Sequence, residues 1–303
     1  MARQTKFCVK DLARALRLPF AAATALPFIF GSLIDKQHFD LIKFILGITV
    51  ALSMHLSANL INDYADSKSL ADWQDLGFYK FFGGSKLIQE GVLSEVFYLW
   101  LGAFFALISA VSAVALALIS NSLLIIGIFL FIFFLSWSYS LKPLQLSYHR
   151  MGEIVVFILF GPVLVMGGYF IQTGIFPDLK SFILSLPFGF FTTAILYGNE
   201  IPDFENDKKS GKLTWVGILG NDRAYIIYLA LVCFAFLSIL FSVTSGYISP
   251  LALFTFVLVP VAVRSAGIFK KYPKEKIKLV ESAKLTIAMH VFASVILIIV
   301  VIL

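Results

Sequence analysis

Charged residues are scarce in this 303-residue chain, and their scarcity excludes a soluble protein. Asp, Glu, Lys and Arg make up 14% of the chain, whereas soluble globular proteins average about 25%. Apolar residues reach 59%, above the roughly 45–50% of soluble proteins. Apolar segments of about 20 residues, the length that an α-helix needs to cross a bilayer, recur along the whole chain. Because these runs are continuous and not alternating, a β-barrel is excluded too.

Cysteine and histidine are also rare. Cys8 lies in the polar N-terminal tail and Cys233 within an apolar run, so the sequence predicts no disulfide framework. The four histidines have no metal-ligand spacing. The N-terminal stretch "MARQTKFCVKDLARALRLP" is basic, but no small-residue cleavage site follows a short apolar core. We therefore expect this N-terminal stretch to be a retained amphipathic segment before the first span and not a signal peptide.

Nine apolar stretches, bounded by polar residues, glycine or proline, predict nine membrane-spanning helices. Their approximate bounds are 18–36, 40–62, 95–119, 122–140, 152–173, 181–200, 223–245, 248–268 and 281–303. No linker between them is long enough, or rich enough in proline or serine, to separate independent domains. We expect an all-α polytopic membrane protein with one transmembrane domain over residues 1–303 and nine helices around a central cavity.

The Lys and Arg residues are distributed unevenly between the two sides of the predicted helices. On the side opposite the N-terminus there are only Lys36, Lys43 and Lys180. An excess of Lys and Arg marks cytoplasmic loops, so we expect the N-terminus and most loops to face the cytoplasm. The net charge of +6 is then a consequence of membrane topology, and no nucleic-acid partner is expected.

Two Asp-rich loops are predicted on the cytoplasmic side, at about 59–94 and 197–221. The first begins with "NLINDYADSKSLAD" (Asn59 to Asp72) directly after an apolar run, and the second contains "YGNEIPDFENDKKSGK" (Tyr197 to Lys212). Two acidic clusters near matching helix ends on one face can converge on a single site. The alternative is two unrelated solvated loops, and topology alone permits both interpretations.

The spacing within the clusters indicates metal binding. Asn62 and Asp66 are four residues apart, and Asn199, Asp203 and Asp207 follow one another at the same step, so on a helix each set shares one face. At the bilayer centre each aspartate would cost roughly 2.5–3.5 kcal/mol, so we expect these residues at the interface, where they neutralise a cation. Asp and Asn oxygens favour a hard ion, Mg²⁺ above all. The alternative is that they are ordinary helix ends and turns.

Pro202, within the second cluster, is expected to kink or end the sixth helix.

Lysines accompany both clusters on the predicted cytoplasmic side. They are Lys68, Lys86, Lys142, Lys208, Lys209 and Lys212. Mg²⁺ and lysine side chains together are the groups expected to bind a diphosphate. Lys142 and Lys212 are the strongest candidates, because each lies in a loop with other unusual residues, although any single lysine also fits a topological charge.

These residues resemble the UbiA superfamily of intramembrane prenyltransferases over most of the chain. "NDYADSKSLAD" and "NEIPDFENDKKSGK" are similar to the two Asp-rich motifs of that family. Four further stretches resemble the branch that prenylates 1,4-dihydroxy-2-naphthoate in menaquinone synthesis: "LRLPFAAATALP", "GGSKLIQEGVLS", "YSLKPLQLSYHRMGE" and "FGPVLVMGGYFIQTG". Many members have a third acidic residue where this chain has Leu70. In the naphthoate branch the acid comes two residues later, where Asp72 stands.

The resemblance implies transfer of a polyprenyl group from its diphosphate to an electron-rich aromatic ring, in the cell membrane, with two Mg²⁺ ions. It implies two metal arms, one of Asn62, Asp63, Asp66 and Asp72 and one of Asn199, Asp203 and Asp207. Asp66, Asp203, Lys142 and Tyr139 would be catalytic, and Lys142, Lys212, Lys86 and Arg17 would bind the diphosphate. Aromatic faces stabilise an allylic cation. The tyrosine candidates for this are Tyr64, Tyr139, Tyr169 and Tyr197.

Rival interpretations remain at this stage. A member of the same superfamily could use another acceptor, such as 4-hydroxybenzoate, a glycerol-phosphate lipid, haem or a chlorin. A transporter would have its carboxylates within the spans and not at one end of two helices. A non-catalytic membrane scaffold would not need the two metal arms. His55, inside the second span, is interpreted as a packing or polar-cavity residue and not as a base.

Overall fold

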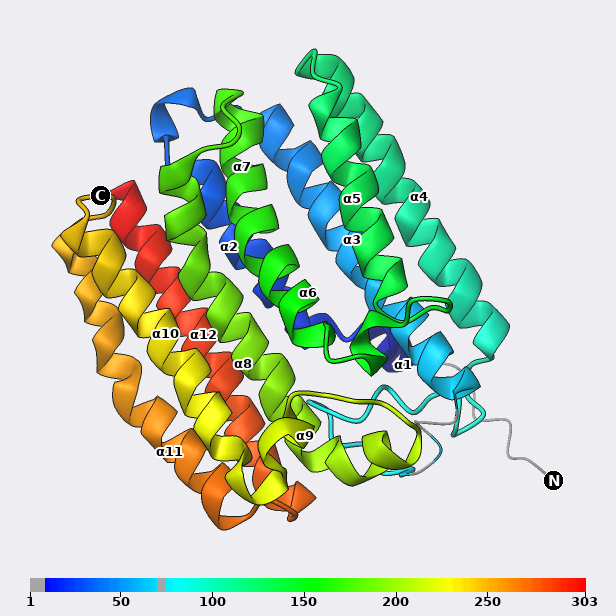
Figure 1. Cartoon of the computed structure of the whole chain (residues 1–303). Helices are drawn as coiled ribbons and strands as arrows, with labels where there is room; N and C mark the ends of the chain where they lie inside the picture. Colours follow the sequence, from blue (N-terminus) through cyan, green and yellow to red (C-terminus); the bar gives the residue numbers. More distant parts are fainter. Residues whose placement is uncertain (1–8, 70–72, 74) are drawn as a thin grey trace.

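The computed structural model describes residues 9–69, 73 and 75–303, and helices make up its architecture (Figure 1). The helices are α1 (Val9–Ala15), α2 (Ala22–Leu33), α3 (Leu41–Lys68), α4 (Glu95–Ile119), α5 (Leu124–Ser138), α6 (Gly152–Ile158), α7 (Leu164–Thr173), α8 (Leu179–Lys209), α9 (Val216–Leu219), α10 (Ala224–Thr244), α11 (Val259–Lys271) and α12 (Lys276–Ile302). The described residues form no strand beyond an isolated bridge between His149 and Leu213. The all-α expectation is confirmed.

Each of the nine predicted stretches is helical. Seven helical stretches in the described ranges are long and apolar enough to cross a membrane, and there are eight if the bent pair at residues 9–33 is one span. This pair bends by 48°. The remaining stretch is α5, which has only 15 residues. A π-helical turn at Leu159–Val163, which contains Pro162, joins α6 to α7, and a 3₁₀ segment at Pro250–Leu258 leads into α11.

Side-chain caps define where the long helices begin. The Asp40 carboxylate accepts hydrogen bonds from the backbone N–H groups of Ile42 and Lys43 at the start of α3, at 2.8 and 3.0 Å. The Asp178 carboxylate accepts one from Ser181 at the start of α8, at 2.6 Å. Such caps satisfy donors that the helix itself leaves unpaired, and they favour a negative charge at the helix N-terminus.

The long helices continue further than the sequence predicts. α3 extends to Lys68 and α8 extends through Pro202 to Lys209, so Asn62, Asp66, Asn199, Asp203 and Asp207 lie at helix ends and not in loops. Only the later parts of the two segments predicted as Asp-rich loops are irregular. Pro202 is accommodated within the helix, which it neither ends nor interrupts.

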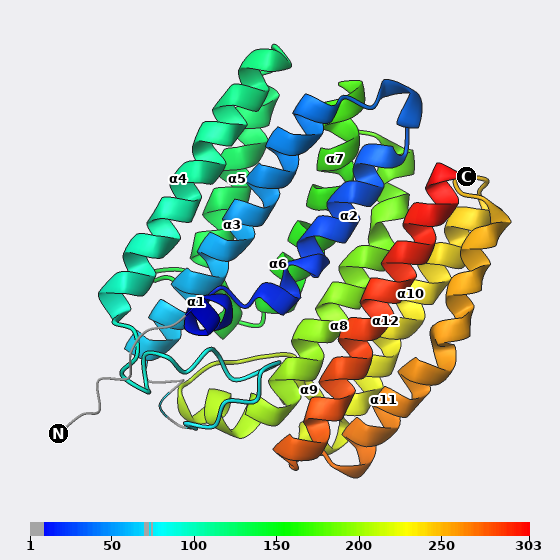
Figure 2. The same cartoon turned by 180° about the vertical axis from the view of Figure 1, so that it is seen from behind.

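The helices form two groups with a layer between them. α3, α4 and α5 lie side by side at one edge of the bundle, and α8, α10, α11 and α12 at the other, with α2, α6 and α7 between (Figures 1 and 2). The described chain begins with α1 at one end of the bundle and finishes with α12 at the opposite end (Figure 1). The loops that follow α3 and α8 lie together at the end where α1 lies.

The middle layer depends on close backbone approach between α2 and α7. A Cβ atom added to Gly168 would lie only 2.6 Å from the carbonyl oxygen of Phe28. Small residues let membrane helices pack this closely, so van der Waals contact between the two backbones replaces side-chain interdigitation. Gly168 therefore fixes the separation of two helices that both line the cavity described below.

We expect Gly168→Ala to lower stability by about 1–3 kcal/mol, because the added methyl overpacks the α2–α7 contact. Thermal unfolding of the purified protein in detergent measures the effect. Gly127→Ala is the matched control, since a Cβ there meets nothing within 4 Å. Equal unfolding midpoints for the two variants would contradict the proposed role of the contact.

Candidate functional site

A cavity of about 340 Å³ opens among α2, α3, α5, α7 and α8. Its polar end is lined by residues from the C-terminal ends of α3 and α8, and its other end is apolar. α3 lines it from Asp66 back to Gly47, and 19 residues of helix correspond to roughly 28 Å. The apolar end includes Val50, Ala113, Leu116, Ile125, Phe129, Phe170 and Ile171. The cavity is thus long, with polar chemistry confined mainly to one end.

The α3 wall of the polar end is held by a hydrogen-bond network around Asp66. The Asn62 amide donates to one Asp66 oxygen at 3.2 Å and to the Ser140 hydroxyl at 3.1 Å. The Tyr148 hydroxyl donates to the other Asp66 oxygen at 3.1 Å. Burial, with Asp66 nearby, raises the pKa of the Tyr148 phenol, so it remains a donor. The helical four-residue step places Asn62 and Asp66 on the face that lines the cavity.

The α8 wall carries buried oxygens that accept no hydrogen bond within the part of the chain that the structure describes. Asn199, Asp203 and Asp207 all line the same cavity as Asp66. The Oδ1 atom of Asn199 and the Oδ2 atom of Asp207 are buried and accept no hydrogen bond from the described residues. Buried acceptors of this kind are costly unless something binds them. They are the first sign that the arrangement is built for a cation.

Lys212 is a cation beside Asp207 on this wall. Its Nζ lies 3.6 Å from Asp207 Oδ2, and its backbone N–H donates to the Asp207 carbonyl at 2.8 Å. Burial alone would lower the pKa of the Lys212 ammonium, but Asp207 and Asp66 raise it well above its ordinary value. Lys212 therefore stays charged at the mouth of the cavity.

A further network joins the α3–α4 loop to α8 and α12. Lys276 Nζ donates to Asp75 Oδ2 at 2.6 Å and to Asp203 Oδ1 at 3.4 Å. Gly83, at a φ of 77° that favours glycine, lies near Asp203 and Lys86, and all three residues line the cavity. The sequence interpretation missed Asp75 and Lys276. Asp75 follows the first cluster closely, whereas nothing near Lys276 in the sequence points to a carboxylate about 70 residues earlier.

Arg17 and Asp63 form an ion pair beside the cavity. The guanidinium of Arg17, in the bend between α1 and α2, pairs with Asp63 Oδ1, and Asp63 Oδ2 accepts the Ser85 backbone N–H at 3.2 Å. Arg17 lines the cavity, but Asp63 does not. The structure therefore departs from the prediction that Asp63 helps to hold a metal, because both of its oxygens face Arg17 and the loop.

Lys142 and Tyr139, both after α5, differ in whether they line the cavity. Lys142 is exposed in the loop after α5 and does not line the cavity, so the structure does not support a diphosphate contact there. Tyr139, three residues earlier, does line it. Asp72 lies outside the described residues. Of the other tyrosine candidates, Tyr64, Tyr169 and Tyr197 are absent from the lining of this cavity.

The polar end fits a metal held jointly with a ligand. Among the residues that the structure describes, no three His, Cys, Asp or Glu side chains come together as a ready-made metal cluster. The aspartates instead lie on two facing walls, with Asn62 and Asn199 beside them. Mg²⁺ suits this arrangement, since it is bound through one or two carboxylates and completes its shell with waters and substrate phosphates. The unpartnered oxygens of Asn199 and Asp207 are the donors that such an ion prefers.

Comparison with known proteins decides the family. The model of the UbiA prenyltransferase family matches residues 24–292. The chain belongs to this family. It is therefore a transferase of prenyl groups, with several apolar helices that make it an integral membrane protein.

Individual relatives agree with this family assignment. The 1,4-dihydroxy-2-naphthoate octaprenyltransferase of Bacillus subtilis (strain 168) is 28% identical over 251 residues, which are 80% of this chain and 76% of the relative. UbiA prenyltransferase domain-containing protein 1 of Dictyostelium discoideum is 26% identical over 204 residues, 67% of this chain, and the match spans only 61% of that protein. A UbiA homolog from Archaeoglobus fulgidus, solved bound to GPP and Mg²⁺, has the same fold, with a TM-score of 0.59. The structural match covers 96% of this chain and 100% of that chain, and the two sequences are 16% identical.

The contrast between the two candidate lysines is testable. We expect Lys212→Met to reduce prenyl transfer roughly 10- to 100-fold, because a charge-assisted contact to an anion is lost at the mouth of the cavity. Lys142→Met should stay close to the wild-type rate, since Lys142 is exposed outside the cavity. Initial rates in detergent, with the KM for prenyl diphosphate, measure both. Similar losses in the two variants would remove the distinction.

Proposed function

We propose that this protein transfers a polyprenyl group from its diphosphate to an aromatic quinone precursor, with 1,4-dihydroxy-2-naphthoate as the acceptor. The observation that carries the proposal is the pair of oxygen-rich walls at one end of a long apolar cavity. A prenyl diphosphate has the same division, with a strongly anionic head and an apolar tail. The similarity to the Bacillus subtilis naphthoate octaprenyltransferase supports this choice of acceptor.

Asn62 and Asp66 on α3, with Asn199, Asp203 and Asp207 on α8, would hold two Mg²⁺ ions around the diphosphate. The bound metal would supply Lewis-acid stabilisation of the leaving group. The Archaeoglobus fulgidus homolog bound to GPP and Mg²⁺ supports an isoprenyl diphosphate and a metal as ligands. For these residues, the unpartnered Asn199 and Asp207 oxygens provide the support within this chain.

Other side chains around the cavity would stabilise the leaving diphosphate and the allylic cation. The bond between the prenyl C1 and the diphosphate oxygen breaks, and its electron pair stays with the diphosphate, whose charge Lys212 and Lys86 stabilise. Tyr139 presents an aromatic ring to the allylic cation. A ring carbon of the acceptor bonds to C1. The proton that this carbon loses passes to the released diphosphate, or carbon dioxide leaves instead if the carbon bears a carboxylate.

The membrane placement that we propose has nine spans, with α5 and the bent α1–α2 pair among them, and the N-terminus in the cytoplasm. Its support is the charge distribution, because the loops that follow α3, α5, α8 and α11, together with the helix ends beside them, carry most of the Lys and Arg residues. These loops lie at the same end of the helix bundle as α1 (Figure 1). The diphosphate would then enter from the cytoplasmic face of the cell membrane, and the tail would extend between the helices.

We expect Asp66→Asn and Asp203→Asn each to reduce prenyl transfer by about 10²–10³-fold or more, since each removes a charge that acts on the leaving group. The assay uses one long prenyl diphosphate and a panel of aromatic acceptors, with product identified by mass. Asp222→Asn, an exposed carboxylate on the polar side of the bundle, is the control and should retain wild-type rates. Wild-type rates in either cavity variant would remove that residue from the site.

We expect chelation of divalent metal with EDTA to abolish turnover and added Mg²⁺ to restore it. The reason is that the facing carboxylates repel a diphosphate unless a cation lies between them. Binding of a radiolabelled prenyl diphosphate should fall in parallel, which separates loss of substrate binding from loss of chemistry. Full activity of metal-stripped protein would contradict the proposal.

A further inference from the structure

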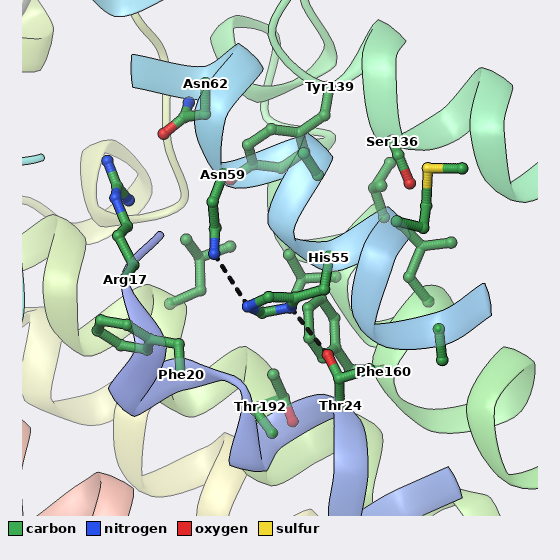
Figure 3. Close-up of a pocket in the computed structure, with 18 of the residues that line it drawn as sticks. Arg17, Phe20, Thr24, His55, Asn59, Asn62, Ser136, Tyr139, Phe160 and Thr192 are labelled. Carbon is green, nitrogen blue, oxygen red and sulfur yellow. Dashed lines mark hydrogen bonds between the residues drawn. The ribbon is translucent and has the colours of Figure 1, made fainter. Parts of the chain in front are cut away.

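A second polar group lies deeper in the cavity, away from the acidic end. Thr24 on α2 and His55 and Asn59 on α3 line the cavity and are joined by hydrogen bonds (Figure 3). Thr24 Oγ1 is 2.8 Å from His55 Nδ1, and Asn59 Nδ2 is 2.9 Å from His55 Nε2. None of these three side chains has a role in holding metal or diphosphate in the proposal above.

The hydrogen bonds define what this group offers to a ligand. The Asn59 amide nitrogen can only donate, so His55 Nε2 accepts, and the ring proton is on Nδ1, which donates to Thr24. His55 is therefore neutral and fully engaged. Asn59 is held at one amide hydrogen, which leaves the remaining edge of its amide facing the cavity. His55 thus acts as a positioning residue for Asn59.

The facing wall supplies a polar atom without a partner. Thr192 on α8 lines the cavity and is only 5% exposed, yet its hydroxyl has no hydrogen-bond partner within the described part of the chain. Thr24, Thr192, Phe20 and Phe160 all line this cavity and are labelled in Figure 3. Phe160 meets the His55 ring edge-on, at 5.6 Å between ring centroids. The pocket therefore combines aromatic walls with a few hydroxyl and amide groups.

The depth of this pocket is set by the two helices that carry the acidic arms. Asn59 lies seven residues before Asp66 on α3, and Thr192 lies seven residues before Asn199 on α8. Seven residues of helix correspond to roughly 10 Å. Thr192 thus lies about two turns below the α8 arm, whereas Asn59 lies only three residues, roughly one turn, before Asn62 of the α3 arm. Both polar groups follow the metal arms toward the apolar end, as the reacting end of a prenyl chain follows its diphosphate.

We propose that Thr24, His55, Asn59 and Thr192 form the subsite for the aromatic acceptor, with a ring hydroxyl bound between Thr192 and Asn59. The inference rests on the proposed function and adds the residues that select the acceptor. A prenyl tail would leave the Thr192 hydroxyl unpaired, and an anionic lipid headgroup would need cations that these four residues do not provide. A neutral hydroxyl on a flat ring satisfies both the polar atoms and the aromatic walls.

Thr192→Val tests the contact directly, because valine keeps the shape and removes the hydroxyl. We expect the KM for 1,4-dihydroxy-2-naphthoate to rise roughly three- to tenfold, with the KM for prenyl diphosphate unchanged. Thr193→Val is the matched control. Its hydroxyl donates to the Gly189 carbonyl at 2.8 Å within α8, and Thr193 does not line the cavity. This variant should leave both KM values unchanged.

A double-mutant cycle tests the positioning role of His55. Asn59→Leu and His55→Phe should each raise the KM for the acceptor, and the double variant should be no worse than Asn59→Leu alone, since His55 acts through Asn59. A purely structural effect of His55→Phe would instead change kcat and both KM values together. Thermal unfolding of each variant identifies any loss of folded protein.

The acceptor subsite and the proposed function fail under different experimental results. If the wild type prenylates an aromatic acceptor but Thr192→Val and Asn59→Leu leave the acceptor KM unchanged, the subsite is overturned and the proposed function stands. If the wild type binds prenyl diphosphate but modifies no hydroxylated aromatic compound in the panel, the proposed function and this inference both fail.

Discussion

Carboxylates at the end of an apolar cavity must be neutralised, and the arrangement of the polar end follows from this constraint. Asp66 is stabilised by hydrogen bonds from Asn62 and Tyr148, Asp207 lies beside Lys212, and Asp203 shares Lys276 with Asp75. Tyr148, Lys212 and Asp75 come from loops and Lys276 from α12, so the loops are held against the ends of α3 and α8. Asn199 Oδ1 accepts no hydrogen bond from the described residues, and Asp207 Oδ2 has only the Lys212 ammonium 3.6 Å away, so these two oxygens indicate where a further cation belongs.

The same constraint explains why the polar groups lie on helices. A rigid helix places side chains at fixed four-residue steps along one face, so Asn62 with Asp66, and Asn199 with Asp203 and Asp207, present their oxygens in register across the cavity. An irregular loop would not fix the distances between these side-chain oxygens. Because α8 continues through Pro202, its last two turns keep this register up to Asp207.

The cavity has three chemical zones along its length. The acidic end suits a metal and a diphosphate, the apolar end suits a prenyl tail, and the group around His55 and Thr192 lies between them. A transferase must bring two substrates together in one water-poor space, and the two substrates differ in their polar groups. The order of the zones along α3 is the order that the proposed prenyl transfer would require.

The sequence by itself determined the helices, the family resemblance and the positions of two Asp-rich clusters, because apolar length and four-residue spacing are local properties of the chain. It also predicted that the two clusters lie near each other, and the structure places Asp66, Asn199, Asp203 and Asp207 around one end of the cavity. Only the tertiary structure decided which partners each arm has. Asp63 pairs with Arg17, Lys142 lies outside the cavity, and Lys276 reaches Asp203. The role of Thr192 likewise depends on which side chains face it from α2 and α3. Such contacts join residues that are far apart along the chain, and they are set by helix packing, which no local pattern encodes.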